Sequence, residues 1–221
     1  MLYTWRFDLV LRWLGFLLLG IQYTIILTGI SVGAGMVIGL LVAASRMSPS
    51  RVLRWAAVAY LDVFRSIPPF VLLLWFFYCI PIITGLQMSA LVSAGVALAL
   101  IAGAFLAETI RAGIQSIERG QAEAGMVVGM VPSQVYRRII LPQALVRMLP
   151  PLISTVISMT KASALASIVG VAELMWQGNA LIQWTFRPVE TLTIVAAVYF
   201  VLTYPQTLLA EYLYRRLSVK D

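Results

Sequence analysis

The sequence has 221 residues, 61% of them hydrophobic and only 11% charged, with a mean hydropathy of +0.93. Soluble domains of this length are far more polar, so the composition predicts one all-α integral membrane domain over residues 1–221. A single cysteine excludes an internal disulfide, and together with the absence of histidine it argues against a metal site in the protein. The net charge of +7 does not indicate nucleic-acid binding, because membrane proteins concentrate lysine and arginine in cytoplasmic loops.

Residues 1–12 form a short amphipathic start that we expect at a membrane–water interface. Residues 13–45 carry no charge and are long enough for a first, tilted span. Four glycines on this span form two pairs with the small-xxx-small spacing that lets helices approach closely: Gly29/Gly33 and Gly35/Gly39. The alternative is that they only reflect the high glycine content of membrane helices.

An arginine-rich loop, residues 46–54, separates this span from a second helix that begins near Trp55. Pro68 and Pro69 are expected to kink or restart that helix, because proline lacks the backbone N–H that a helix interior needs. The uncharged run over residues 66–107 is too long for one span.

Breaks within this run are predicted at Pro81 and at the Thr84–Gly85 pair. The second span is therefore expected to end near Ile80. The third is expected to run from about residue 89 to residue 107.

The segment that follows, residues 119–142, differs from its apolar surroundings. It carries four charged residues: Arg119, Glu123, Arg137 and Arg138. Its longest uncharged run, residues 124–136, is too short to cross a bilayer. Gly129 can close one short helix and Ser133, after Pro132, can cap the next. The segment is therefore predicted to be a helix-turn-helix at the membrane surface, a shape suited to docking a soluble partner.

A fourth span is predicted over residues 148–172, opened by Pro150–Pro151 and carrying one charge, Lys161. Residues 173–190 are expected to form a polar loop, whose tryptophans suit the membrane–water boundary. The fifth span is predicted over residues 191–210, which carry no charge.

The distribution of positive charge predicts the orientation of these five spans. With residues 119–142 inside, twelve of the 16 Lys and Arg residues lie at the cytoplasm: Arg46, Arg51, Arg54, Arg65, Arg111, Arg119, Arg137, Arg138, Arg147, Arg215, Arg216 and Lys220. The inverted topology would reverse this ratio. Positive residues collect on the cytoplasmic side, so the N-terminus is expected outside and the C-terminus inside.

Motifs for catalysis are missing from the sequence. It contains no G-x-x-x-x-G-K-[ST] phosphate-binding loop, and a triad that needs histidine is impossible. We therefore predict no catalytic residue and no cofactor bound by this chain. The same observation gives little support to a membrane-embedded enzyme. Any energy for transport by ATP must come from a partner.

Lys161 lies ten residues after Pro151, about 15 Å along a helix, and so close to the middle of the membrane. A charge at this depth is costly, so it faces a water-filled path, pairs with an acidic group or snorkels to an interface. In a path, its ammonium group would suit a carboxylate ligand. The neighbouring hydroxyls of Ser158, Thr160 and Ser163 are further pathway candidates, with the alternative that they bond backbone carbonyls.

Glu108, near the inner end of the third span, is another pathway candidate. Arg111 lies three residues further along, so the alternative is a Glu–Arg pair on the helix surface. A different class of function remains open on these residues. Lys161 and Glu108 could serve ion coupling in a self-contained secondary transporter or channel.

Residues 119–142 resemble the EAA loop of bacterial ABC-importer permeases, E-A-A-x3-G-x9-I-x-L-P. The matching residues are Glu123, Ala124, Gly129, Ile139, Leu141 and Pro142, and the one departure is Gly125 in place of the second alanine. The resemblance implies a type I permease subunit, multi-pass in a bacterial inner membrane. It also implies that residues 119–142, with Glu123, Ala124, Gly125, Gly129 and Pro142, are the coupling helix that inserts into an ATPase subunit.

Nearly the whole chain is similar to the polar amino acid permeases, a five-span subfamily. Shared stretches are FR-G-T-P, at Phe64, Arg65 and Pro68; A-Y-x-x-E, at Ala104, Phe105 and Glu108; L-P-Q-A, at Leu141 to Ala144; and K-D-T-S-L, at Lys161 to Leu165. In the subfamily the last stretch lines the substrate pocket. Here Lys161 and Leu165 are kept, whereas Ala162, Ser163 and Ala164 replace its aspartate, threonine and serine. If that aspartate reads a cationic side chain, the substrate is not expected to be arginine or lysine. The stretches FRSIP…LLWFFY and RAGIQSI…RGQ resemble the acidic-amino-acid permeases most, which favours an acidic substrate.

The resemblance also implies the partners. ATP and Mg²⁺ would be held by separate ABC ATPase subunits, and a second permease chain, identical or related, would complete the path. An extracytoplasmic solute-binding protein would deliver the amino acid, and lipid would surround the spans.

Overall fold

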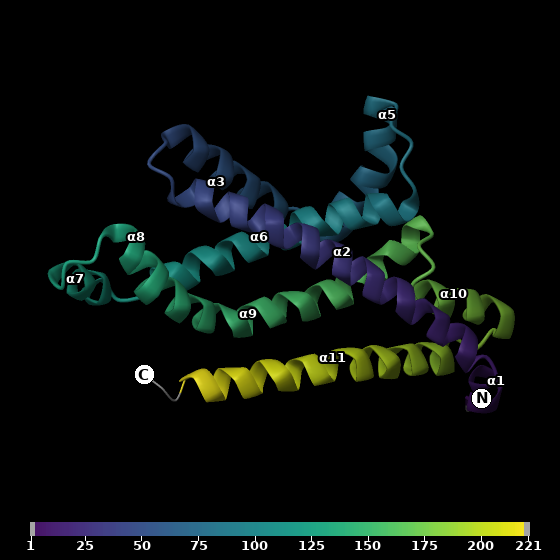
Figure 1. Cartoon of the computed structure of the whole chain (residues 1–221). Coiled ribbons are helices and arrows are strands. Elements are labelled where there is room, and N and C mark those ends of the chain that lie inside the picture. The colour runs from purple at the N-terminus through teal and green to yellow at the C-terminus, as the bar shows by residue number, and fades with distance from the viewer. Residues whose placement is uncertain (1–2, 219–221) are drawn as a thin grey trace.

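The computed structural model describes residues 3–218, and every regular element within them is helical, as the sequence predicts (Figure 1). The α-helices are α1 (Phe7–Leu11), α2 (Leu14–Met47), α3 (Arg51–Ser66), α4 (Pro69–Leu74), α5 (Ile80–Thr84), α6 (Ala90–Gln115), α7 (Arg119–Val127), α8 (Pro132–Val135), α9 (Leu141–Ala162), α10 (Leu174–Thr185) and α11 (Pro188–Ser218). Two π-helical turns, Trp75–Cys79 and Tyr136–Ile140, and a 3-10 helix, Ser163–Val169, complete the set in the described part.

Four segments of the described chain are long and apolar enough to cross a membrane: Leu14–Met47, Ala90–Gln115, Pro132–Val169 and Pro188–Arg216. The second predicted span corresponds to a bent pair of helices, Arg51–Ser66 and Pro69–Thr84, whose axes differ by 103°. The bend lies at Pro68 and Pro69, where the sequence predicts a kink or a restart. The N- and C-termini lie at opposite ends of the molecule, as an odd number of spans requires (Figure 1).

Helices α2 and α6 form the centre of the bundle and pack closely along their lengths. An added Cβ at Gly35 would lie 2.8 Å from Cβ of Ala102, and one at Gly39 would lie 2.9 Å from Cβ of Leu106. The small-residue pairing predicted for Gly35/Gly39 is therefore confirmed. It is wrong for Gly29/Gly33 within this chain, because an added Cβ there would meet no other described atom within 4 Å.

Each π-helical turn ends two residues before a proline, Pro81 or Pro142. Proline lacks an N–H donor and its ring crowds the carbonyl four residues earlier, so a wider turn lets the helix continue. The predicted break at Pro81 is therefore wrong. The helix passes through Pro81 and ends at Gly85, whose φ of +74° suits a glycine C-cap.

The fourth span begins earlier than predicted. Helix α9 starts at Leu141 directly after the π-helical turn, with Pro142 as its second residue. Pro150 and Pro151, which the sequence analysis placed at the opening of this span, lie inside the helix.

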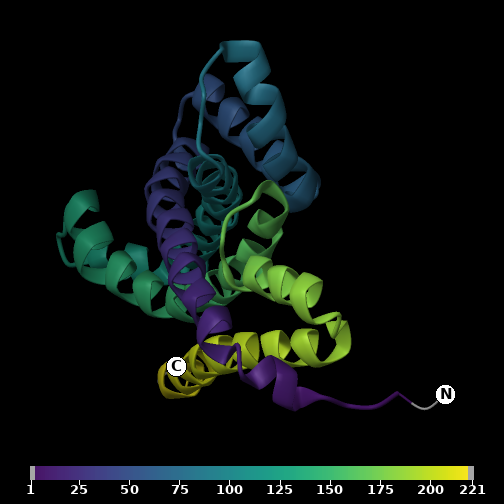
Figure 2. The same ribbon diagram turned by 90° about the vertical axis from the view of Figure 1, so that its right-hand side faces the viewer.

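The predicted polar loop over residues 173–190 is largely helical, which is a second correction. Helix α10 packs on the outer part of α2 and on α11 (Figure 2). The Glu173 side chain is fully buried and caps α10 by accepting the backbone N–H groups of Met175, at 2.9 Å, and Trp176, at 2.7 Å. A buried carboxylate is tolerated at the start of α10 because the free backbone N–H groups of the first turn donate hydrogen bonds to it.

Candidate functional site

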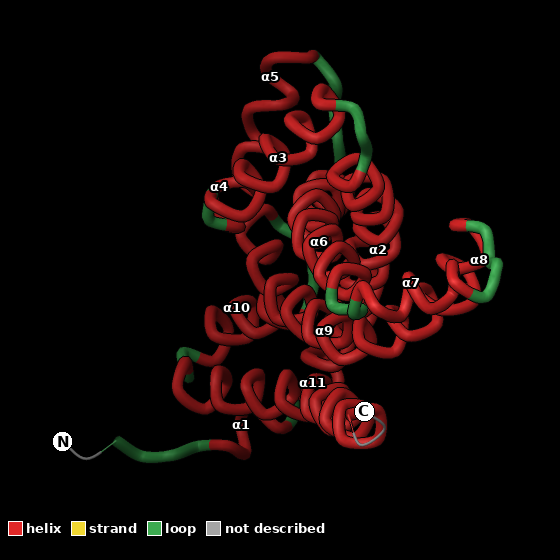
Figure 3. Tube along the Cα trace, turned by 90° about the vertical axis from the view of Figure 1, so that its left-hand side faces the viewer, coloured by secondary structure: helices red, strands yellow, loops and turns green. Residues whose placement is uncertain are grey.

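Helices α7 and α8 project from one end of the bundle and stand apart from the other helices (Figure 3). Helix α7 ends at Val127, and Gly129, with φ of +86°, turns the chain as predicted. The capping role predicted for Ser133 is wrong. The N-cap is Val131, because Pro132 already lies in the first turn, and the Gln134 side chain accepts the Val131 N–H at 3.1 Å. We call residues 119–142 the elbow.

The departure of the elbow from the EAA pattern has a packing reason. The elbow has two arms, α7 and the segment formed by α8 and the π-helical turn Tyr136–Ile140. Gly125 is buried where these two arms meet. An added Cβ would lie 2.7 Å from Cδ1 of Ile139 and 3.0 Å from Cγ2 of Val135. Glycine therefore lets the two arms approach more closely than alanine would.

The outer surface of the elbow is free within this chain. Glu123 and Ala124 are exposed, as is Pro142 in the first turn of α9, and no ion pair of Glu123 is found in residues 3–218. Val127 and Val128 at the tip are 86% and 77% exposed. An apolar tip that projects beyond the membrane helices, next to charged residues, is typical of a protein-docking surface.

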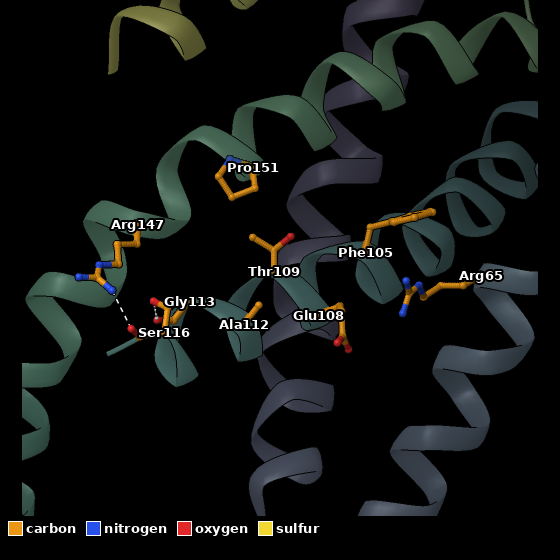
Figure 4. Close-up of a pocket in the computed structure, with 9 residues that line it drawn as sticks. All are labelled: Arg65, Phe105, Glu108, Thr109, Ala112, Gly113, Ser116, Arg147 and Pro151. Atoms are coloured by element: carbon orange, nitrogen blue, oxygen red, sulfur yellow. Dashed lines mark hydrogen bonds between the residues drawn. The ribbon is translucent and has the colours of Figure 1, made fainter. Parts of the chain in front are cut away.

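Two adjoining hollows follow the face between α6 and α9. The inner one has a volume of about 500 Å³ and is lined by Arg65, Phe105, Glu108, Thr109, Ala112, Gly113, Ser116, Arg147 and Pro151 (Figure 4). The outer one, of about 140 Å³, is lined by Phe105, Ser154, Thr155, Ser158 and Met159. We call the two hollows together the groove.

The predicted pathway residues divide between the groove and the interior of the bundle. Glu108 lines the inner hollow and also forms the ion pair with Arg111 that was the alternative to a pathway role. Ser158 lines the outer hollow, and its hydroxyl also donates to the backbone carbonyl of Ser154 at 2.9 Å. Lys161, exposed and one turn further along α9, lies on the same helix face as Ser158.

Thr160 and Ser163 point elsewhere. Both are buried, and their hydroxyls donate to backbone carbonyls, Thr160 to Val156 at 3.0 Å and Ser163 to Thr160 at 2.8 Å. These are the backbone contacts that the sequence analysis held open as the alternative. Thr160 lines a separate cavity of about 260 Å³ between α2, α9 and α11.

Several groove residues were not predicted as pathway residues from the sequence. On α9 the exposed residues Arg147, Pro151, Ser154, Ser158 and Lys161 follow one another at spacings of three or four. That helical spacing was readable in the sequence as one polar stripe. Arg65, by contrast, reaches the groove from α3, and no local pattern indicates this.

The charges of the inner hollow indicate an aqueous surface. Arg65, Glu108 and Arg147 would be costly against lipid hydrocarbon, so this face meets water or another protein chain. Arg147 donates to the carbonyl of Ser116 at 2.6 Å, level with the inner end of α6. Lys161 lies 14 residues further along α9, about 21 Å away, so the polar stripe follows most of a hydrocarbon core about 30 Å thick.

Comparison with known proteins places this geometry in a family. Residues 35–219 match the family described as binding-protein-dependent transport system inner membrane component. The chain is 34% identical to the probable glutamine ABC transporter permease protein GlnM of Bacillus subtilis, over 90% of this chain and 92% of that one. It is also 34% identical to the glutamate/aspartate import permease protein GltK of Escherichia coli O157:H7, over 97% of this chain and 99% of that one.

A solved structure agrees with these matches. The crystal structure of an amino acid ABC transporter with histidines superposes on 97% of this chain and 100% of that one, with a TM-score of 0.91 and 34% sequence identity. At this similarity the likeness extends from the fold to the sequence.

Proposed function

Since this chain belongs to the family of binding-protein-dependent transport system inner membrane components, we propose that it is the permease subunit of an ATP-driven importer of polar amino acids, coupled to its ATPase through the elbow. As a member of that family it is a multi-pass protein of the inner membrane. The proposed coupling to an ATPase is supported by the projecting elbow, with its apolar tip and exposed Glu123.

Continuity between the elbow and α9 supports a mechanical role. The π-helical turn Tyr136–Ile140 runs directly into α9, with no loop between them. A displacement of the elbow would therefore tilt α9, which carries Arg147, Ser154, Ser158 and Lys161 along the groove. In this proposal, closure of the ATPase moves the elbow, and α9 changes access to the substrate from one side of the membrane to the other.

The proposal assigns ATP and Mg²⁺ to separate ATPase subunits and no cofactor to this chain. The groove is open on one side, so a second permease chain, identical or related, is needed to enclose a path. A solute-binding protein would deliver the amino acid from outside. A self-contained ion-coupled transporter has no support, because the relatives are ABC permeases.

The substrate class follows from the relatives and from the groove. Relatives of equal identity are named for glutamine and for glutamate and aspartate, so overall similarity does not choose between them. The groove offers hydroxyls and charges of both signs, which suit a zwitterion. Ala162 supplies no carboxylate beside Lys161, which favours an acidic or neutral amino acid over a basic one.

The test is purification of the tagged chain with its associated subunits, followed by reconstitution into vesicles with its binding protein. We expect an ATPase to co-purify and ATP-dependent uptake of a radiolabelled acidic or neutral amino acid. Uptake driven by an ion gradient in vesicles without any ATPase would contradict the importer. A preference for arginine would contradict only the substrate class.

A further inference from the structure

Helix α6 is buried almost continuously at its centre, with one exception. In the stretch from residue 101 to residue 107, Phe105 is the only exposed residue, at 41% of its surface. Its neighbours Ala104 and Leu106 are fully buried against other helices. The exposed ring therefore points out of the packed side of α6 and into the groove.

Phe105 occupies the border between the two hollows of the groove. It is the residue that lines both of them in the described chain. On its cytoplasmic side the inner hollow continues with Glu108 and Ala112, and on its other side the outer hollow continues with Ser154 and Ser158. Ten residues separate Phe105 from the inner end of α6, which is about 15 Å, or half of the hydrocarbon core.

The ring is held from a third helix. The guanidinium carbon of Arg65 on α3 lies 5.9 Å from the centroid of the Phe105 ring, within the range of a cation–π contact. Figure 4 shows Arg65 approaching from a separate helix toward Phe105 and Glu108. Arg65 stands two residues before Ile67, which ends α3 ahead of the 103° bend. A change in the angle of α3 would therefore move the guanidinium relative to the ring.

We propose that Phe105 is a gate across the substrate path, which separates the cytoplasmic hollow from the mid-membrane hollow, and that Arg65 positions it. This inference rests on the proposed function of the groove. The Phe105 ring offers no hydrogen-bonding group. A polar amino acid that lost its water molecules at the ring would therefore gain no hydrogen bonds in return, and it cannot pass while the ring stands across the path. Separation of α3 from α6 releases the ring and opens the path.

The experiment measures passive leakage through the complete transporter. The chain is purified in complex with its associated subunits and reconstituted into lipid vesicles without ATP. The vesicles are loaded with L-[¹⁴C]glutamine or L-[¹⁴C]glutamate. Phe105→Ala is expected to release the label at least about ten-fold faster than the wild type, which corresponds to a barrier lower by about 1.4 kcal/mol. Phe105→Tyr keeps the ring and is expected to remain tight.

Matched variants separate gating from a general defect. Phe200→Ala removes another exposed ring, on α11 and away from both hollows, and is expected to remain tight. Phe105→Leu keeps part of the apolar volume and is expected to leak less than Phe105→Ala. If the alanine variant does not assemble, the leucine variant carries the test.

Arg65 is tested by its charge. Arg65→Gln is expected to leak more than the wild type and Arg65→Lys less than Arg65→Gln, because lysine keeps a cation near the ring. Assembled Phe105→Ala or Phe105→Leu complexes as tight as the wild type, or Phe200→Ala complexes equally leaky, would overturn the gate. If the wild-type complex with its binding protein and ATP takes up amino acids, such a result refutes the gate alone. If it takes up none of the amino acids tested, the proposed function itself fails.

Discussion

At the outer end of the molecule Glu173 and Glu190 are completely buried, whereas Glu123 on the inner elbow is exposed. Glu173 accepts two backbone N–H groups and the hydroxyl of Tyr199, at 2.7 Å. Glu190 accepts the Arg6 backbone N–H at 2.8 Å and the Tyr3 hydroxyl. The outer carboxylates are thus engaged in holding α10, α11 and the N-terminal segment together, while the elbow leaves its carboxylate available to a partner.

The two ends should therefore respond differently to substitution. Burial raises the pKa of the Glu173 carboxyl, and its three hydrogen bonds oppose that shift. A change at the outer end should therefore cost stability. A change on the exposed surface of the elbow should cost coupling and leave the fold intact.

The largest loss of stability is expected from Gly20→Val, at the contact between α2 and α10. An added Cβ there would lie 2.6 Å from the backbone Cα of Leu174, which cannot turn aside as a side chain can. We expect the free energy of unfolding, measured by SDS titration, to fall by about 3 kcal/mol. The matched control is Gly33→Ala, where an added Cβ meets nothing within 4 Å. There we expect a gain of about 0.5–1 kcal/mol from helix propensity. Equal losses at both glycines would show that α10 does not pack on α2 as described.

A smaller loss is expected from Glu173→Ala. The substitution removes the N-cap of α10 and leaves the partly buried Tyr199 hydroxyl without its acceptor, so we expect a loss of about 2–3 kcal/mol by the same measurement. Tyr199→Phe removes one of these hydrogen bonds and keeps the cap, and should cost less than Glu173→Ala. A cost for Tyr199→Phe as large as that for Glu173→Ala would argue against the capping role.

The smallest effect on stability is expected at the elbow. Glu123→Ala removes an exposed carboxylate and should leave the melting temperature of the purified chain unchanged. In reconstituted vesicles the same variant should lose uptake while the ATPase still hydrolyses ATP. Normal ATP-dependent uptake by this variant would remove Glu123 from the coupling contact, and a lowered melting temperature would contradict the contrast between the two ends.

Predictions from the sequence succeeded where the signal was local. The spans at residues 13–45, 89–107 and 191–210 follow from charge-free runs, and the turn at Gly129 follows from a glycine between two short helices. Predictions failed where a residue's effect depends on its partner. Pro81 and Pro150 do not break their helices. Residues 174–185 are helical, and the Glu173 carboxylate that caps them also accepts the Tyr199 hydroxyl of α11. Lys161 was singled out by its charge, whereas Phe105 was noted only in a motif and Arg65 only in a motif and in the charge count.

By itself the sequence predicted five membrane spans and a charged elbow between the third and fourth spans that lies outside the hydrocarbon on the cytoplasmic side. Both properties depend on the free-energy cost of placing a charged side chain in hydrocarbon. This cost is set mainly by the residue itself and little by which residues surround it in the fold. Only the tertiary structure decided which faces of α3, α6 and α9 meet. That choice depends on side-chain packing between residues as distant as Arg65, Phe105 and Ser158, and it brings these residues to one groove.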